Sequence, residues 1–231
     1  MQTYLLIIFI FVFIAAQVSS QNVRVTMIGD SITEGGGCGL GTYVTILESM
    51  LGELYTVQNC GKSSQTMLKL GKCNTKSGNP PADIGSCSYW NTDSWTQAKE
   101  SKPDIVTIFL GTNDAKYFNW EGIQQDLGDY YALDYVDMIN TLKAFEPTPK
   151  IYIVVPPLLF PPYPFQMNAT VINNIYPRLL RNIASVSDVQ LIDVHSAYAN
   201  SPLGQNLTCD GAHPSVAGME LIADAIYTAI H

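Results

Sequence analysis

Five short apolar runs recur along the chain, and segments with helical periodicity separate them. The runs lack the alternation of a half-exposed strand, so each is predicted to be a strand covered on both faces. Strands that alternate with helices imply a parallel sheet with right-handed crossovers. We therefore predict an α/β fold, a three-layer α/β/α sandwich with a five-stranded parallel sheet. The predicted strands span residues 23–28, 55–58, 105–110, 151–155 and 189–194.

Apolar residues spaced three or four apart predict the helices. The spacing is regular over 127–145 and 222–230, and less regular over 42–51 and 171–186. Residues 61–103 show little periodicity and are predicted to form a long loop. Ligands of such sheets bind beyond the carboxyl ends of the strands. Polar motifs that follow a strand are therefore the candidates for a functional site.

The first twenty residues carry no charged side chain and hold an apolar core from Leu5 to Ala16. That core is shorter than the ~18 residues needed to cross a bilayer. We predict a secretory signal peptide at 1–20 and a single domain at 21–231, with the protein secreted or in the secretory-pathway lumen. An uncleaved membrane anchor is the alternative, because no Lys or Arg precedes the apolar core.

The net charge is −8, and lysines and arginines do not cluster. Such a chain is a poor candidate for binding nucleic acid or anionic lipid. We expect neutral small-molecule or glycan substrates, no nucleic-acid partner and no stable membrane insertion after signal cleavage. Asn168 and Asn206 begin Asn-X-Thr sequons, which are weak signals for glycosylation.

Five cysteines follow the predicted signal peptide, and an oxidising compartment would favour disulfides between them. Cys73 and Cys87 bracket a loop rich in glycine and proline and are a reasonable pair. A bond between Cys38 and Cys209 would join two motif-bearing loops. Cys60, at the end of a predicted strand, is expected to be buried and free. The spacing matches no zinc site.

The motif GDSITEG, residues 29–35, follows the first predicted strand and contains Ser31. A serine hydroxyl becomes a nucleophile only when a neighbouring base removes its proton. Ser31 is therefore a candidate nucleophile that requires a histidine from elsewhere in the chain. The alternative is a helix N-cap, a common use of serine after a strand.

The motif DGAHPS near the carboxyl end supplies that histidine. Asp210 precedes His213 by three residues, so the turn would hold the carboxylate beside the imidazole. A capped helix start is the alternative. His195, with Asp193 two residues before it, is the rival base. We prefer His213 because its loop can reach across to Ser31, and we expect His195 to line the pocket or to hydrogen-bond locally.

Acyl transfer also needs hydrogen-bond donors for the oxyanion of the tetrahedral intermediate. The second predicted strand leads into Asn59-Cys60-Gly61, and the third leads into Gly111-Thr112-Asn113-Asp114. Glycine offers an unobstructed backbone N–H and asparagine a side-chain amide. Gly61 and Asn113 are therefore the candidate donors, with ordinary turn chemistry as the alternative.

Together these motifs resemble the four signature blocks of the GDSL or SGNH hydrolases: GDSITEG, NCGKSS, GTND and DGAHP occur in order over essentially the whole mature chain. The resemblance implies a flavodoxin-like sandwich that needs no metal or other cofactor. It also implies that Ser31 is the nucleophile and that His213 is the base oriented by Asp210. The implied oxyanion donors are Gly61, Asn113 and the Ser31 N–H.

The segments GTNDAKYFNW, IYIVVPPLLF and LIDVHSAY look most like the branch of that family that contains sialate O-acetylesterase-like and other carbohydrate deacetylases. This implies a secreted serine esterase acting on short acyl esters of sugars, O-acetylated sialic acid among them. Asp30, Asp114 and Trp120 are expected to contact the substrate, Trp120 by stacking on a sugar ring. At least half of the other loop aromatics are expected only to pack the loops.

Two other functions compete with this hypothesis. A lysophospholipase or longer-chain acyl esterase would need a wide aliphatic groove, for which Leu158, Leu159 and Phe160 are the visible candidates. A non-catalytic carbohydrate-binding module could use the same scaffold, but it would not need the complete set of catalytic residues.

Overall fold

The structure is a computed structural model that describes residues 22–73, 83–123 and 128–231. The predicted signal peptide lies outside the described residues. No described helix combines the length and the apolar character that a membrane span requires.

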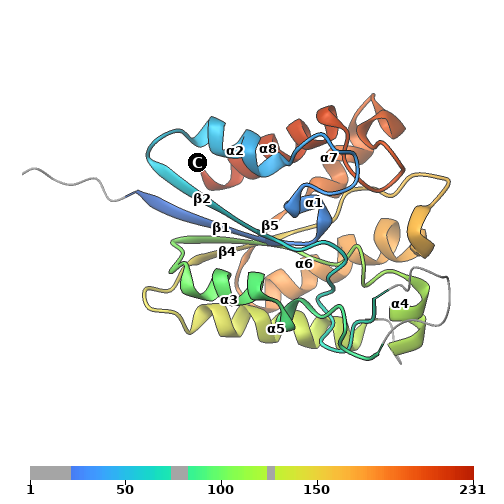
Figure 1. The fold of residues 1–231 in the computed structure, drawn as a ribbon, viewed down its shortest axis with the longest axis horizontal. Helices are drawn as coiled ribbons and strands as arrows, with labels where there is room; N and C mark the ends of the chain where they lie inside the picture. Colours follow the sequence, from blue (N-terminus) through green and yellow to red (C-terminus); the bar gives the residue numbers. More distant parts are fainter. Residues whose placement is uncertain (1–21, 74–82, 124–127) are drawn as a thin grey trace, which may run out of the picture.

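A parallel sheet of five strands forms the centre of the molecule, with strand order β2-β1-β3-β4-β5 (Figure 1). This confirms the predicted α/β fold. All five strands were expected to be covered on both faces, but β2 and β5 lie at the two edges of the sheet and are only partly buried. The strands are β1 (Val23–Gly29), β2 (Tyr55–Gly61), β3 (Ile105–Phe109), β4 (Lys150–Val154) and β5 (Gln190–Ile192).

Helices cover both faces of the sheet and give it three layers (Figure 1). Successive side chains of a strand point to opposite faces, so β1 sends Met27 into one apolar core and Ile28 into the other. One layer contains α2 (Tyr43–Leu51), α7 (Val194–Asn200) and α8 (Val216–Ile230), and the opposite layer contains α3 (Asp93–Glu100), α5 (Asp129–Lys143) and α6 (Tyr176–Val186).

Helices α2, α7 and α8 each begin where a polar side chain satisfies a free N–H group of the first turn. Thr42 caps α2, Asp193 caps α7 and Ser215 caps α8, each by accepting a hydrogen bond from the first turn. Short helical segments complete the chain: α1 (Ser31–Glu34), α4 (Tyr117–Ile123), the 3₁₀ turns Tyr89–Asn91, Pro164–Gln166 and Gly204–Leu207, and the π-helical turn Val171–Ile175.

Helix α3 lies within the segment that was predicted to be a loop. Only Trp95 and Ala98 of this helix are buried, so its sequence shows no repeating apolar stripe. Thr92 caps it by accepting from the Trp95 N–H at 3.1 Å. The prediction of a long irregular loop is therefore wrong for residues 93–100.

Two disulfides join Cys38 to Cys209 and Cys73 to Cys87. Cys60 is free and buried, and burial raises the pKa of its thiol to about 11. The predicted pairing and the predicted free thiol are thus confirmed. The Cys38–Cys209 bond connects two loops that are 171 residues apart in the sequence.

Candidate active site

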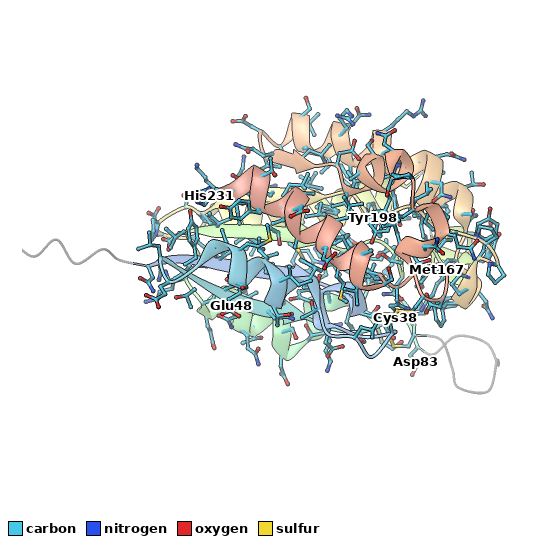
Figure 2. The ribbon with its side chains drawn as sticks, turned by 90° about the horizontal axis from the view of Figure 1, so that it is seen from above. Cys38, Glu48, Asp83, Met167, Tyr198 and His231 are labelled. Carbon is cyan, nitrogen blue, oxygen red and sulfur yellow. A yellow bond between two sulfur atoms is a disulfide. The ribbon has the colours of Figure 1, made fainter. Side chains whose placement is uncertain are left out.

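The strand register brings the polar motifs to one edge of the sheet. Gly29, which ends β1, pairs with Gly61 of β2 on one side and with Phe109 of β3 on the other. Figure 2 shows Cys38 and Met167 at the same end of the molecule, with His231 at the opposite end. A cavity of about 180 Å³ opens there, lined by Ser31, Gly37, Ser63, Ser64, Asn113, Lys116, Phe165, Met167 and His213.

Ser31 is placed by a tight turn between β1 and α1. A Cβ atom on Gly29 would lie 2.0 Å from Thr33 Oγ1, so only glycine permits this turn. Asp30, and not Ser31, caps α1: its Oδ1 accepts from the Ile32 N–H at 3.0 Å. The Ser31 hydroxyl is therefore not used as a cap, and it lies 3.1 Å from His213 Nε2.

His213 is held by Asp210, as the spacing in the sequence predicted. His213 Nδ1 lies 2.7 Å from Asp210 Oδ2, while Asp210 Oδ1 accepts from the N–H groups of Ala212 and His213. Burial acts to raise the pKa of Asp210, but these hydrogen bonds outweigh it and hold the pKa below its usual value. An ionised Asp210 favours the tautomer with the proton on Nδ1, which leaves Nε2 free to accept the Ser31 proton.

Two further residues hold the imidazole, and the sequence did not identify either. A Cβ atom on Gly37 would lie 2.2 Å from His213 Cγ, so the ring packs directly on the Gly37 backbone. The Phe165 ring contacts the imidazole edge-on, with the ring centroids 5.3 Å apart. The run of three glycines at 35–37 was the available signal, because such a run permits close approach of another group.

The predicted oxyanion donors divide into two groups. Asn113 lines the cavity, and its Nδ2 donates to the Gln65 carbonyl at 3.1 Å and only distantly, at 3.5 Å, to Asp30 Oδ2. Gly61 does not line the cavity. Its N–H donates to Asn59 Oδ1 at 2.8 Å, and its Cα packs against the backbone of α1. The prediction for Gly61 is therefore corrected.

Ser64 takes the place that was predicted for Gly61. It follows β2 by three residues, lines the cavity and has a φ of 68°, in the left-handed region. In the part of the chain that the structure describes, its N–H donates no hydrogen bond. The Ser31 N–H, at the first position of α1, also has no intrahelical acceptor. The candidate oxyanion hole thus consists of the Ser31 and Ser64 N–H groups and Asn113 Nδ2.

The three residues predicted to contact substrate are buried behind the cavity. Asp30 is 1% exposed and caps α1, and Asp114 is fully buried and accepts from the N–H groups of Met67 and Leu68. Trp120 is 7% exposed and packs edge-on against Tyr176. All three predictions are corrected: these polar and aromatic groups support the loops from inside.

The rival base, His195, does not line the cavity. Its Nε2 is buried and has no partner among the described residues, so the expected local hydrogen bond is absent there. Asp193 instead caps α7 and pairs with Arg181. Burial lowers the pKa of His195, which therefore favours its neutral form in the folded protein.

Because the His195 imidazole is buried, we expect the folded protein to lose stability in acid. An unfolded histidine titrates near pH ~6.5, so the neutral form stabilises the fold above that pH, and this contribution is lost as the pH falls toward the lower folded pKa. We expect His195→Phe to weaken the dependence of the unfolding free energy on pH between about pH 7.5 and about pH 5. Urea titrations at several pH values measure the free energy of unfolding of both proteins. Parallel curves of this free energy against pH for the wild type and His195→Phe would contradict the prediction.

The wild type must serve as the reference in that experiment. Burial raises the pKa of Asp30 to about 6 and that of Asp114 to about 7. A carboxyl group whose pKa is raised by folding contributes less to the stability of the folded protein as the pH rises. This trend opposes the effect of His195. Both carboxyls are present in the two proteins, so the difference between the curves isolates the imidazole.

Removal of the Cys38–Cys209 disulfide is expected to cost more stability than removal of the Cys73–Cys87 disulfide. The Cys38–Cys209 bond follows Gly37 and precedes Asp210, so it ties together the two loops that carry the Ser31–His213 pair. In the chain-entropy model, removing a link over 171 residues costs about 5 kcal/mol, against about 3 kcal/mol for a separation of 14. We expect C38S/C209S to lower both the melting temperature and the rate of any reaction that uses the Ser31–His213 pair. The matched C73S/C87S variant should affect mainly stability, and equal rate losses in the two variants would contradict a positioning role.

Comparison with known proteins agrees with this geometry. Residues 27–221 match the sequence pattern of the GDSL-like Lipase/Acylhydrolase family. An acetylxylan esterase from Xylanibacter ruminicola is 31% identical over 228 residues. That alignment covers 90% of this chain but 43% of the relative, so the chain spans less than half of that protein's length.

Two solved structures share the fold. The lipase/acylhydrolase from Enterococcus faecalis has a TM-score of 0.65 at 20% identity, and the match covers 90% of this chain and 95% of that one. An acetylxylan esterase from Geobacillus stearothermophilus has a TM-score of 0.63 at 24% identity, and covers 90% and 94%.

Proposed function

The chain belongs to the GDSL-like lipase/acylhydrolase family, and on this basis we propose that it hydrolyses short acyl esters, O-acetyl groups on carbohydrates in particular, by a two-step serine mechanism. The observation that carries the proposal is the continuous hydrogen-bonded series from Ser31 through His213 to Asp210, with distances of 3.1 and 2.7 Å. A binding module has no need of a serine activated in this way.

The first step forms an acyl-enzyme. His213 Nε2 removes the Ser31 proton as Oγ attacks the ester carbonyl carbon. The carbonyl oxygen becomes an oxyanion that accepts from the N–H groups of Ser31 and Ser64 and from Asn113 Nδ2. The imidazolium is stabilised by Asp210, and it then gives its proton to the oxygen of the departing alcohol as the ester bond breaks.

The second step releases the acid. Water takes the place of the alcohol, His213 removes one of its protons, and the resulting hydroxide attacks the acyl carbon. The second tetrahedral intermediate uses the same three donors. It collapses when the proton returns from His213 to Ser31 Oγ, which frees acetic acid and restores the enzyme.

The small cavity supports a short acyl group. Its volume is about 180 Å³, and Phe165 and Met167 form part of its wall. The aliphatic residues considered for a longer-chain esterase do not form an open groove: Leu159 is 3% exposed, and Leu158 and Phe160 pack against the apolar core. Similarity to acetylxylan esterases supports a carbohydrate leaving group, with acetylated xylan and O-acetylated sialic acid as the substrates to test.

A chain-length series tests the proposal. We expect p-nitrophenyl acetate to be hydrolysed with a higher kcat/KM than the butyrate, and the octanoate to be the poorest of the three. Acetate release from acetylated xylo-oligosaccharides and from O-acetylated sialic acid measures the carbohydrate preference. A rate maximum at the octanoate would contradict the short-acyl proposal and favour the longer-chain esterase.

Covalent labelling separates an enzyme from a binding module. A fluorescent fluorophosphonate forms a stable adduct with an activated serine, and we expect one adduct at Ser31 by peptide mass spectrometry. No labelling, together with measurable glycan binding, would favour the carbohydrate-binding alternative.

Secretion is part of the proposal. Two disulfides accord with an oxidising compartment, and cleavage after residue 20 would leave residues 21–231 as the mature domain. The exposed Asn206 and the partly buried Asn168 remain predicted glycosylation sites. The amino-terminal sequence and mass of the protein recovered from the medium of expressing cells test these points together.

A further inference from the structure

Lys116 is a buried lysine that lines the candidate catalytic cavity. It lies in the loop after β3, and its backbone pairs with Met167 as an antiparallel bridge. The residue is 6% exposed, yet it lines the same cavity as Ser31 and Asn113. The mechanism proposed above gives this side chain no role.

Within the described part of the chain, the ammonium group of Lys116 has no acceptor. Among the described residues, none forms a salt bridge or a hydrogen bond with Lys116 Nζ. The nearby carboxylates are engaged elsewhere: Asp30 Oδ1 accepts from the Ile32 N–H, and Asp114 accepts from two backbone N–H groups. A desolvated charge without a partner is costly, so its presence at a cavity calls for an explanation.

We propose that Lys116 binds a carboxylate of the substrate and thereby makes acetylated acidic sugars better substrates than neutral ones. This inference rests on the proposed esterase function and names the substrate class for it. An ammonium group has three donors and no acceptor, so only an acceptor can satisfy it. A carboxylate also neutralises the charge, and a charge-assisted hydrogen bond is stronger than one to a hydroxyl group.

A matched pair of substrates tests this preference. A mono-O-acetylated methyl glucuronoside and its uncharged primary amide differ only in the carboxylate, and the 2-, 3- and 4-O-acetyl isomers cover the positions of the ester. At pH ~7 we expect kcat/KM to be about tenfold higher for the acid than for the amide, as a charge-assisted hydrogen bond would give. Lys116→Met should bring this ratio close to one, and Lys116→Arg should retain most of it.

Lys150→Met is the matched control. Lys150 is exposed at the amino end of β4, away from the cavity, so its loss should leave the acid-to-amide ratio unchanged. A purely structural role for Lys116 would lower the rates of both substrates equally and leave their ratio at the wild-type value. That result would overturn the inference, as would equal wild-type rates for acid and amide.

The pH dependence of the ratio gives an independent readout. Burial lowers the pKa of Lys116, so the ammonium group loses its proton at a lower pH than an exposed lysine does. The other titrating groups near it are Asp30, Asp114 and His213, which act on both substrates alike. We expect the wild-type ratio to fall as the pH rises from neutral into the alkaline range, and the Lys116→Met ratio to stay flat. A flat wild-type ratio would contradict the inference.

Failure of the inference and failure of the proposed function are distinguishable. If the wild type hydrolyses p-nitrophenyl acetate but shows no preference for the acid, the esterase stands and Lys116 does not select a carboxylate. Hydrolysis of p-nitrophenyl acetate with no turnover of any sugar ester also overturns the inference. If the wild type hydrolyses none of these esters, the esterase proposal itself fails.

Discussion

Ser31→Ala is expected to lower the turnover of p-nitrophenyl acetate by at least about 1000-fold and to leave the fold intact. Removing Oγ deletes the atom that attacks the ester, and no other described side chain lies within hydrogen-bonding distance of His213 Nε2 to replace it. The fold is insensitive to the change because Asp30 caps α1. Initial rates and circular dichroism of the two proteins measure both effects.

Ser185→Ala provides the control for that experiment. Ser185 lies exposed on α6, and the same loss of a hydroxyl group there should leave the rate unchanged. If Ser31→Ala kept the wild-type rate, the nucleophile would have to be another group. If it lost both rate and structure, the loss of activity would say nothing about Ser31 chemistry, and fluorophosphonate labelling of the wild type would then decide the assignment.

Gly37→Ala is expected to lower kcat/KM by about 100-fold, because a displacement of about 1 Å in a catalytic group costs that much. The new methyl group would lie 2.2 Å from His213 Cγ, so the imidazole must move away from Ser31. The hydrogen bond between Ser31 Oγ and His213 Nε2 would lengthen, although every catalytic atom is retained. Steady-state kinetics on p-nitrophenyl acetate measure the loss.

Gly41→Ala is a closely matched control for this change. Gly41 lies in the same loop with a φ of +96°, against +99° for Gly37, but nothing lies within 4 Å of its added Cβ. Both substitutions therefore carry the backbone strain of a positive φ, and only Gly37→Ala meets the imidazole. Equal rate losses would assign the effect to loop strain and contradict direct packing of His213 on Gly37.

The structure explains how two distant parts of the sequence keep catalytic distances. The loop after α1 is tied to the His213 loop by the Cys38–Cys209 disulfide and by the contact between Gly37 and the imidazole. Phe165 also contacts the same ring. The position of His213 is thus fixed from several directions, as the geometry of general-base catalysis requires.

Net charge and the lining of the cavity lead to different expectations about the substrate. The chain carries a formal charge of −8, which led to an expectation of neutral substrates. Among the described residues that line the cavity, Lys116 is the one lysine, and our proposal assigns to it a carboxylate of the substrate. Net charge averages over the whole surface, whereas a desolvated group within a cavity acts on the substrate at short range.

Much of the architecture was predictable because its signals are local. Apolar runs separated by helical patterns predicted the five parallel strands. The motifs after the first and third strands and the motif before the last helix predicted that Ser31, Asn113, Asp210 and His213 would meet. The helix α3 escaped prediction because only Trp95 and Ala98 of it are buried. An amphipathic sequence pattern arises when several side chains on one face of a helix are buried. Helix α3 buries only two side chains, so its sequence shows almost no such pattern.

The sequence by itself determined which polar residues follow the strands and which come directly before the last helix, and hence the candidate nucleophile, base and orienting carboxylate. Only the tertiary structure decided which atoms face the cavity. Gly61 donates its N–H to Asn59, whereas the Ser64 N–H has no acceptor among the described residues. Asp30, Asp114 and Trp120 are buried in the interior. The physical reason is that a backbone or side-chain group can serve a substrate only if no nearer partner satisfies it, and those partners come from segments far apart in the chain.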